Sequence, residues 1–271
     1  MSRNASTRSQ EKPKRSSLSL PETETVLGLN IARTNYAEAA EIALRRSENK
    51  EKPFLIAAAN THLTTLARHS KSFGEAMREF DLICPDGMPL VWALNQGKKR
   101  EEKLRDRVYG PELMLRVFQA SNARGSDRHF LIGGPEETLE SLRRFFGERY
   151  PKAPIVGMHC PPFRKWDEAD DAVVSRSVAE SKANVVWIGL GCPKQELLLA
   201  RIKNQLSPAA YFAVGAAFAF HAGQVPQAPR VLQRAGLEWV FRLLVEPRRL
   251  GSRYLKFNFL FCYYYVRSLL Y

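Results

Sequence analysis

Short apolar runs alternate with stretches of helical periodicity along most of the chain. The runs span four to eight residues, as in PFLIAAAN (53–60) and DLICPDG (81–87). After most of them, apolar residues recur every three or four positions. A buried strand of a parallel sheet has continuous apolar sequence, and the crossover to the next strand usually holds a helix. The pattern predicts an α/β fold, with a mostly parallel, Rossmann-like sheet and helices on both faces.

The strands are expected in seven apolar runs, at residues 25–31, 53–60, 81–87, 128–134, 154–159, 184–191 and 210–218. A further helix is expected from about Asp167, where the sequence DEADD (167–171) begins. These acids resemble the Asp-x-Asp of metal-dependent sugar-nucleotide enzymes. They do not follow a strand, however, and acids favour the positive end of a helix dipole. We therefore interpret them as a solvated helix start, and no metal site is predicted.

The chain changes character at Ala228, where a basic and aromatic segment begins. Apolar residues at helical spacing (Leu237, Val240, Phe241 and Leu244) alternate with arginines, and the segment ends in an aromatic-rich stretch. Such an amphipathic pattern suits the headgroup region of an anionic bilayer. A helix packed on the core with solvated arginines is one alternative, and a nucleic-acid surface is another. We expect three parts: a disordered basic tail (1–23), an α/β core (24–227) and a C-terminal appendage (228–271).

The net charge of +13 lies mainly at the two ends of the chain. Residues 1–20 carry +4 and residues 228–271 carry +6, so the middle of the chain is nearly neutral. A nucleic-acid-binding domain is expected to carry its charge on a folded face. This distribution therefore argues against a nucleic-acid partner. A filter-binding assay with strong salt dependence would revive that alternative.

Four widely spaced cysteines and the absence of an apolar leader place the protein in a reducing compartment. No Cys-x-x-Cys pair occurs, so neither a zinc site nor a disulfide framework is predicted. The first twenty residues lack the apolar region of a secretory signal. No window reaches the roughly 20 apolar residues that a membrane-spanning helix needs. These features predict a cytoplasmic protein.

Turn-forming and polar residues gather where the predicted strands end. They include Asn60, Asp86-Gly87, Gly133-Gly134 and the loop from Gly189 to Gln195. In open α/β sheets, ligands bind outside the carboxyl ends of the strands, where glycines let the backbone approach a phosphate. Partial burial at its strand end would raise the pKa of Asp86 and suit it to act as a general base. The alternative for Asp86 is a turn or helix-capping residue.

Several segments together resemble the WecG/TagA/CpsF family of bacterial glycosyltransferases, which is glycosyltransferase family 26. The resemblance covers about residues 26–261 and rests on ANTHLTTLARHS (59–70), DLICPDGMPLVW (81–92), RVYGPELM (107–114), IGLGCPKQE (188–196) and GLEWVFRLLVEPRR (236–249). It implies transfer of a hexose or N-acetylhexosamine from a UDP-sugar to a polyprenyl-diphosphate-linked glycan, in exopolysaccharide or surface-glycan synthesis. The enzyme would attach peripherally to the inner face of the cytoplasmic membrane. We expect inversion at the anomeric carbon, with no metal and no cofactor.

The same resemblance assigns the site residues. Asp86 corresponds to the family's general base, and arginines of the appendage are expected to meet acceptor or lipid phosphates: Arg242, Arg248, Arg249 and Arg253. The residues expected to bind substrate are Asn60, Thr61, Gly87, Arg107, Gly110, Gly133, Gly134, Gly189, Gly191, Lys194, Gln195 and Gly215.

Three positions depart from the family pattern, and one rival function stays open. Ala219 stands where many relatives have Asp, Ala58 where Thr is common, and Glu112 where Asp is usual, which leaves the donor sugar undetermined. The rival is a non-catalytic sugar-nucleotide sensor or scaffold, which would not need Asp86. A homo-oligomer is compatible with the sequence.

Overall fold

The computed structural model describes residues 19–49, 51–162, 164 and 166–270, and for residues 230, 234, 248–250 and 252–255 it describes the backbone alone. Most of the predicted basic tail therefore lies outside the described residues. Two sheets are present in the described part: an antiparallel pair and a six-stranded parallel sheet of order β4-β3-β8-β7-β5-β6. The strands are β1 (Thr23–Val26), β2 (Leu29–Ala32), β3 (Phe54–Ala59), β4 (Leu82–Pro85), β5 (His129–Ile132), β6 (Ile155–His159), β7 (Val185–Ile188) and β8 (Ala210–Ala213).

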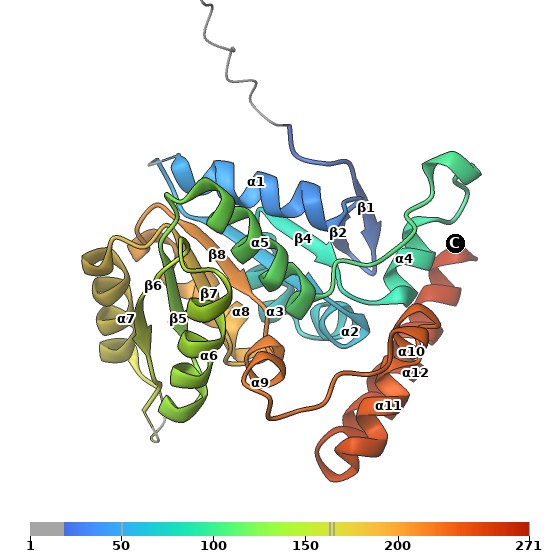
Figure 1. Cartoon of the computed structure of the whole chain (residues 1–271). Helices are drawn as coiled ribbons and strands as arrows, with labels where there is room; N and C mark the ends of the chain where they lie inside the picture. The colour runs from blue at the N-terminus through green and yellow to red at the C-terminus, as the bar shows by residue number, and fades with distance from the viewer. Residues whose placement is uncertain (1–18, 50, 163, 165, 271) are drawn as a thin grey trace, which may run out of the picture.

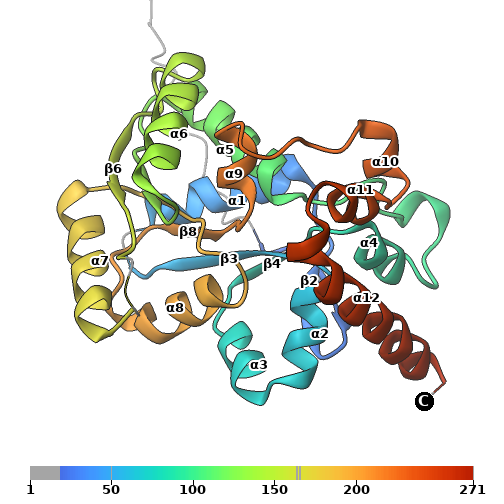
Figure 2. The ribbon, with the colours of Figure 1, turned by 90° about the horizontal axis from the view of Figure 1, so that it is seen from below.

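Helices cover both faces of the parallel sheet, as Figure 2 shows in a view along its edge. One face packs against α1 (Tyr36–Glu48), α5 (Gly110–Arg124), α6 (Glu136–Arg149) and α9 (Ala217–His221). The other packs against α2 (Thr61–His69), α3 (Lys71–Arg78), α7 (Glu168–Ser181) and α8 (Lys194–Ile202). All six strands are parallel, and most of their residues are buried. The predicted α/β, Rossmann-like fold is confirmed.

The prediction of one strand at residues 25–31 is wrong, because this segment forms two strands. It is a hairpin of β1 and β2 that forms its own antiparallel sheet. Leu27 and Gly28, at φ of 52° and 89°, make the turn between the two strands. Two successive residues at positive φ are the signature of a tight hairpin turn, and the glycine adopts this conformation without steric cost.

The acidic cluster begins α7, as predicted, and Asp167 and Glu168 are exposed, but the other two acids are buried. Asp167 caps the helix, and Asp170 and Asp171 are only 8% and 4% exposed. Arg164 pairs with Asp170 at 2.8 Å, and Arg201 of α8 pairs with Asp171 at 2.7 Å. The interpretation as a solvated helix start was therefore wrong for Asp170 and Asp171, which pair with the nearby Arg164 and with Arg201, 30 positions away on α8. The cluster serves to fasten α7 to its neighbours.

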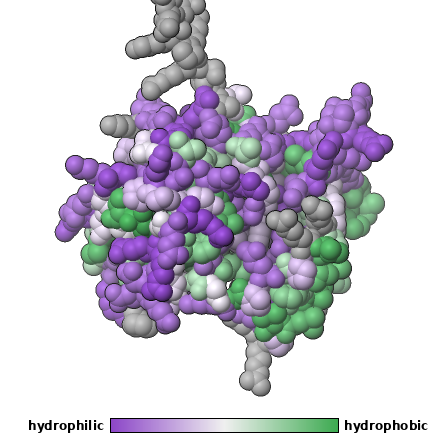
Figure 3. Space-filling view, in the orientation of Figure 1, coloured by the Kyte–Doolittle hydropathy of each residue, from purple (hydrophilic) through white to green (hydrophobic). Residues whose placement is uncertain are grey.

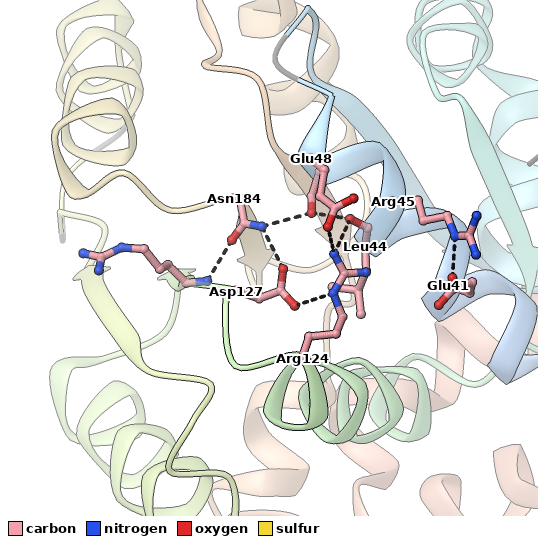
Figure 4. Close-up of polar contacts among 9 residues, drawn as sticks. Glu41, Leu44, Arg45, Glu48, Arg124, Asp127 and Asn184 are labelled. Carbon is pink, nitrogen blue, oxygen red and sulfur yellow. Dashed lines mark hydrogen bonds and ion pairs between the residues drawn. The ribbon is translucent and has the colours of Figure 1, made fainter. Parts of the chain in front are cut away.

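A polar network closes the amino-terminal edge of the sheet, opposite the strand exits (Figure 4). Asp127, 1% exposed, lies 3.2 Å from Arg124 Nε and accepts a hydrogen bond from Asn184 at 2.9 Å. Arg124 also pairs with Glu48 of α1. Because a buried carboxylate is costly unless it is paired, these contacts explain how Asp127 is accommodated. They join α1, α5 and the start of β7.

The remaining elements are α4 (Met88–Leu94), two short 3₁₀ turns, η1 (Arg100–Glu102) and η2 (Lys203–Gln205), and the C-terminal helices α10 (Arg230–Arg234), α11 (Glu238–Val245) and α12 (Pro247–Leu269). The C-terminal helices lie beyond the carboxyl ends of β3 and β4, beside α2 and α4 (Figures 1 and 2). α12 packs along α2, with Phe261 buried in the core. Pro247 separates α11 from α12, as its position in the sequence predicts.

Apolar side chains are exposed on the C-terminal helices, and Figure 3 shows them gathered over this corner of the molecule. Leu244 of α11 is 76% exposed and Phe259 of α12 is 71% exposed. Other exposed apolar residues of this unit are Val231, Leu237, Val245, Tyr263, Val266, Leu269 and Leu270. Among the described residues, no helix combines the length and the apolar composition that crossing a bilayer requires.

Candidate active site

Most of the residues predicted at the strand exits come together around a polar cavity of about 440 Å³, although Gly133 does not line it. Its walls come from the ends of β3, β4, β5, β7 and β8 and from α9. The lining includes Asn60, Asp86, Gly134, Gly189, Gly191, Gln195, Gly215 and Arg242. The carboxyl ends of parallel strands meet at one edge of a sheet, and this is why segments more than 150 residues apart in sequence form one site.

Two glycines allow the loops after β5 and β7 to cross at this edge. Gly133 has φ of 116°, and a Cβ at this residue would lie 2.9 Å from the backbone carbon of Gly189. A Cβ on Gly189 would lie 2.5 Å from the ring of Phe218. Both distances are shorter than a carbon–carbon contact allows, so only glycine fits.

Gln195 ties two of the loops together from within the protein. It is 3% exposed, and its Oε1 accepts hydrogen bonds from Gly191 N at 3.2 Å and Gly215 N at 3.0 Å. Its Nε2 donates to Glu196 Oε1 at 2.8 Å. Burial raises the pKa of Glu196 to about 7. Lys194 is exposed and lies outside the walls of the described cavities, so its contact with ligand stays a prediction.

Asp86 follows β4 directly and is held by backbone contacts. Its N–H donates to Ala59 O at 2.7 Å, and its carboxylate accepts from the backbone N–H of Gly110. Burial raises the pKa of Asp86 well above its ordinary value, while the positive charge of Arg107 opposes this shift. The direction of this shift is the one expected from burial. A carboxylate with raised pKa at a cavity wall can accept a proton near neutral pH.

The start of α2 joins the site to α12. Asn60 caps α2 by accepting from Leu63 N at 3.1 Å, and it lines the polar cavity. Thr61 Oγ1 donates to Asn258 Oδ1 of α12 at 2.6 Å. The ring of His62 meets the ring of Phe257 edge-on at 4.4 Å. The residues of the ANTH segment therefore contact the C-terminal helices as well as the cavity.

A second cavity, of about 500 Å³, opens on the other side of Asp86. Its walls are largely apolar and come from α4, α11 and α12, with Met88, Trp92, Leu237, Trp239, Phe261, Tyr265 and Val266 among them. Gly87, Thr61 and Arg107 also line it. The two cavities share Asn60, His62, Asp86, Tyr109 and Arg242. Asp86 thus stands where a polar and an apolar cavity meet.

Arg107 forms a buried ion pair that the sequence did not reveal. Its Nη2 donates to Glu238 of α11, and the two side chains are 7% and 10% exposed. Its guanidinium lies 4.2 Å from the centre of the Tyr109 ring. Glu238 and Tyr109 were missed because the pairing depends on tertiary structure. The sequence offered one indication that Glu238 has a specific partner: it is one of only two acids in the basic segment of residues 228–271.

Arg242 is the one predicted appendage arginine with a described side chain. It lies 5.3 Å from the ring of Phe220 and faces Glu246 at 3.9 Å, and its buried Nε has no hydrogen-bond partner among the described residues. The side chains of Arg248, Arg249 and Arg253 lie outside the described part. Of the departures from the family pattern, Ala58 and Ala219 line the polar cavity, whereas Glu112 pairs with Arg116 at 2.8 Å.

Comparison with known proteins agrees with this geometry. The family model described as "Glycosyl transferase WecG/TagA/CpsF family" matches residues 24–271. Three similar proteins come from Staphylococcus aureus strains NCTC 8325 / PS 47, COL and MSSA476. Each is 24% identical over 227 residues, which is 83% of this chain and 86% of the relative. Each carries the name N-acetylglucosaminyldiphosphoundecaprenol N-acetyl-beta-D-mannosaminyltransferase. The chain belongs to the WecG/TagA/CpsF family of glycosyl transferases.

Proposed function

We propose that the protein transfers a sugar from a UDP-sugar to a polyprenyl-diphosphate-linked glycan, with Asp86 as the general base. The observation that carries this proposal is the position of Asp86 at the junction of a polar and an apolar cavity. A nucleotide sugar suits the polar side and a lipid-linked acceptor suits the apolar side. The reacting hydroxyl and the anomeric carbon would meet at the carboxylate between them.

The polar cavity has the features of a diphosphate site. The helices that begin at its wall, α6 and α8, have no side-chain hydrogen bond at their N-cap residues, Pro135 and Pro193. Free N–H groups and the helix dipole favour an anion at such an end. Gly134 and Gly191, at φ of 78° and 77°, form the loops that precede these helices. We assign this cavity to the UDP part of the donor.

The apolar cavity and the exposed apolar residues of α11 and α12 support a lipid-linked acceptor. The cavity lies between these helices and α4, so a polyprenyl chain could run from the bilayer toward Asp86. Basic and apolar residues combine in this segment as in interfacial helices. We therefore propose that residues 228–271 dock the α/β core of residues 24–227 on the inner face of the cytoplasmic membrane. A homo-oligomeric state stays a prediction from the sequence.

The proposed reaction is a single displacement. Asp86 takes the proton of the acceptor hydroxyl, and the hydroxyl oxygen forms a bond to the anomeric carbon of the donor. The bond from that carbon to the diphosphate oxygen breaks, and UDP leaves with the electron pair. Attack from the face opposite the leaving group inverts the anomeric configuration. Loop N–H groups and Arg242, which lines the polar cavity, would stabilise the charge on the leaving diphosphate in place of a metal.

The names of the relatives indicate which substrates to test first. They point to an N-acetylhexosamine as the transferred sugar and to N-acetylglucosaminyl-diphosphoundecaprenol as the acceptor. The pathway, exopolysaccharide or another surface glycan, follows from the acceptor that is used.

The experiment incubates purified protein with this acceptor in vesicles and with UDP-N-acetylmannosamine, UDP-N-acetylglucosamine or UDP-glucose, with and without EDTA. We expect one donor to extend the acceptor by one sugar, detected by mass spectrometry, at a rate that EDTA leaves unchanged. Binding of UDP-sugars without any transfer would contradict the proposed function and favour the sensor alternative. Activity that EDTA abolishes and Mg²⁺ restores would contradict the metal-free mechanism alone.

A further inference from the structure

The C-terminal helices place one carboxylate inside the site, on Glu238. This residue is the first of α11 and is only 7% exposed. It accepts a hydrogen bond from Arg107 Nη2, and the Tyr109 hydroxyl also bonds to it. Gln233 of α10 accepts from the same Arg107 nitrogen at 3.3 Å. Two helices of the appendage therefore hold one guanidinium of the core.

The position of Arg107 matters because Arg107, Glu238 and Asp86 line the same apolar cavity. The guanidinium is confined between the ring of Tyr109 on one side and the two appendage acceptors on another. A buried arginine held by several groups presents its charge in a fixed direction. Without Glu238, the charge of Arg107 would be left with the carboxylate of Asp86, because Gln233 is neutral.

The charges around Asp86 act in opposite directions. Arg107 and Arg242 lower the pKa of Asp86, whereas Glu238 raises it. Three other titratable groups that interact with Asp86 are Tyr36, Cys84 and Tyr109, and the ring of His62 lines both cavities with Asp86. Burial raises the pKa of all three, so they stay neutral at pH 7. Among the described residues, Glu238 is thus an acidic neighbour that offsets the two arginines.

We propose that Glu238 is a positioning residue that fixes Arg107 and sets the strength of Asp86 as a base, so that the base is tuned only when the C-terminal helices are docked. The inference rests on the proposed function and goes beyond it. It makes the appendage a part of the catalytic arrangement as well as a means of attachment. Loss of the Glu238 carboxylate would leave the charge of Arg107 acting on Asp86 without this opposing charge, and Asp86 would become a weaker base.

The first test is the pH profile of kcat/KM, which reports the essential groups of the free enzyme. Glu238→Gln is expected to move the acid limb to lower pH and to reduce the plateau roughly tenfold. Gln233→Glu adds a carboxylate to the same guanidinium and should move the limb to higher pH. Glu238→Asp keeps the charge and should leave the limb near its original pH. The control Glu41→Gln, which removes an exposed pair with Arg45, should change nothing.

The proposal would be overturned if the acid limb of the kcat/KM profile lay at the wild-type pH in both Glu238→Gln and Gln233→Glu. A purely structural role for Glu238 would lower the rate without moving the limb. The acid limb is expected to move in opposite directions in the two variants. If Glu238→Gln does not fold, the shift in Gln233→Glu alone tests whether a charge at this guanidinium acts on Asp86.

The second test does not need activity. At pH 8, Asp86→Asn removes a buried carboxylate whose pKa is raised, so it should increase Tm. The increase should be smaller in the Glu238→Gln background, by about 2 °C or more, because the repulsion from Glu238 is already absent. Equal increases in both backgrounds would overturn the proposal. If the protein transfers no sugar, the proposed function is contradicted. The comparison of Tm changes in the two backgrounds would still show whether Glu238 acts on Asp86.

Discussion

Replacing Gln195 by Met is expected to loosen the edge of the polar cavity. Methionine has nearly the same length and can fill the space, but it can neither accept from two backbone N–H groups nor donate to Glu196. The change removes the three hydrogen bonds that the Gln195 amide makes to Gly191, Gly215 and Glu196. It therefore tests whether one buried amide holds the loops after β7 and β8 in place.

The cost can be worked out from the burial of the partners. An orphaned buried polar group costs about 1–3 kcal/mol, and the lower end applies to Gly191 and Gly215, which are partly exposed. Glu196 is 1% exposed, and its Oε2 already has no hydrogen-bond partner among the described residues, so loss of the Gln195 donor adds a further penalty. The sum is about 3 kcal/mol, which corresponds to a fall in Tm of roughly 6–12 °C for a protein of this size.

The assay is thermal unfolding together with calorimetric titration of the UDP-sugar. Donor affinity should fall about tenfold or more, because both loops line the donor cavity. The matched control is Gln224→Met, which removes one hydrogen bond from an exposed glutamine to Thr138 at the same cavity. The control should change stability by less than about 0.5 kcal/mol. Wild-type stability and donor affinity in Gln195→Met would refute the reasoning.

Three further predictions concern other parts of the site. Because burial raises the pKa of Glu196 from 4.5 to about 7, its carboxyl favours the folded state at low pH, and this contribution is lost as pH rises toward 7. Glu196→Gln should therefore lose less stability than wild type between pH 5 and 8 in urea titrations. Gly189→Ala should cost about 1–3 kcal/mol because its Cβ meets Phe218, whereas Gly147→Ala, in open space on α6, should be neutral or stabilising; equal effects would contradict the crossing-loop geometry. Replacing Leu244 and Phe259 by Glu should release the protein from anionic vesicles at unchanged Tm, while Val173→Glu on α7, 47% exposed, should not.

The sequence predicts the architecture because the signals for it are local. Continuous apolar runs of four to eight residues leave few alternatives to buried parallel strands. Pro247 marks a helix boundary because proline is not accommodated in a helix interior. The turn at Leu27-Gly28 shows the limit of this reasoning. A single apolar run from residue 25 to 31 reads as one strand, and its two halves form a hairpin.

The site was predictable to the extent that strand exits are predictable. Asn60, Asp86, Gly189 and Gln195 each follow a strand, and parallel strands bring their exits together. The partners of these residues were not predictable. Glu238 lies 131 positions from Arg107, and no local pattern specifies that pair. The same reason explains the burial of Asp171 on α7, because its partner Arg201 lies 30 positions away in the sequence.

The central claim is that Asp86 is the base for sugar transfer at the junction of the two cavities. The measurement that tests it most directly compares kcat and UDP-sugar affinity in wild type and in Asp86→Asn. The control is Asp167→Asn, at the exposed N-cap residue of α7. The account predicts that Asp86→Asn lowers kcat by roughly 10²–10⁴ while donor affinity changes less than about twofold, because the amide fills the same space but cannot accept the proton. In wild type, kcat/KM should rise with pH through the raised pKa of Asp86, and in Asp86→Asn this rise should be absent. Turnover of Asp86→Asn near the wild-type rate would contradict the account.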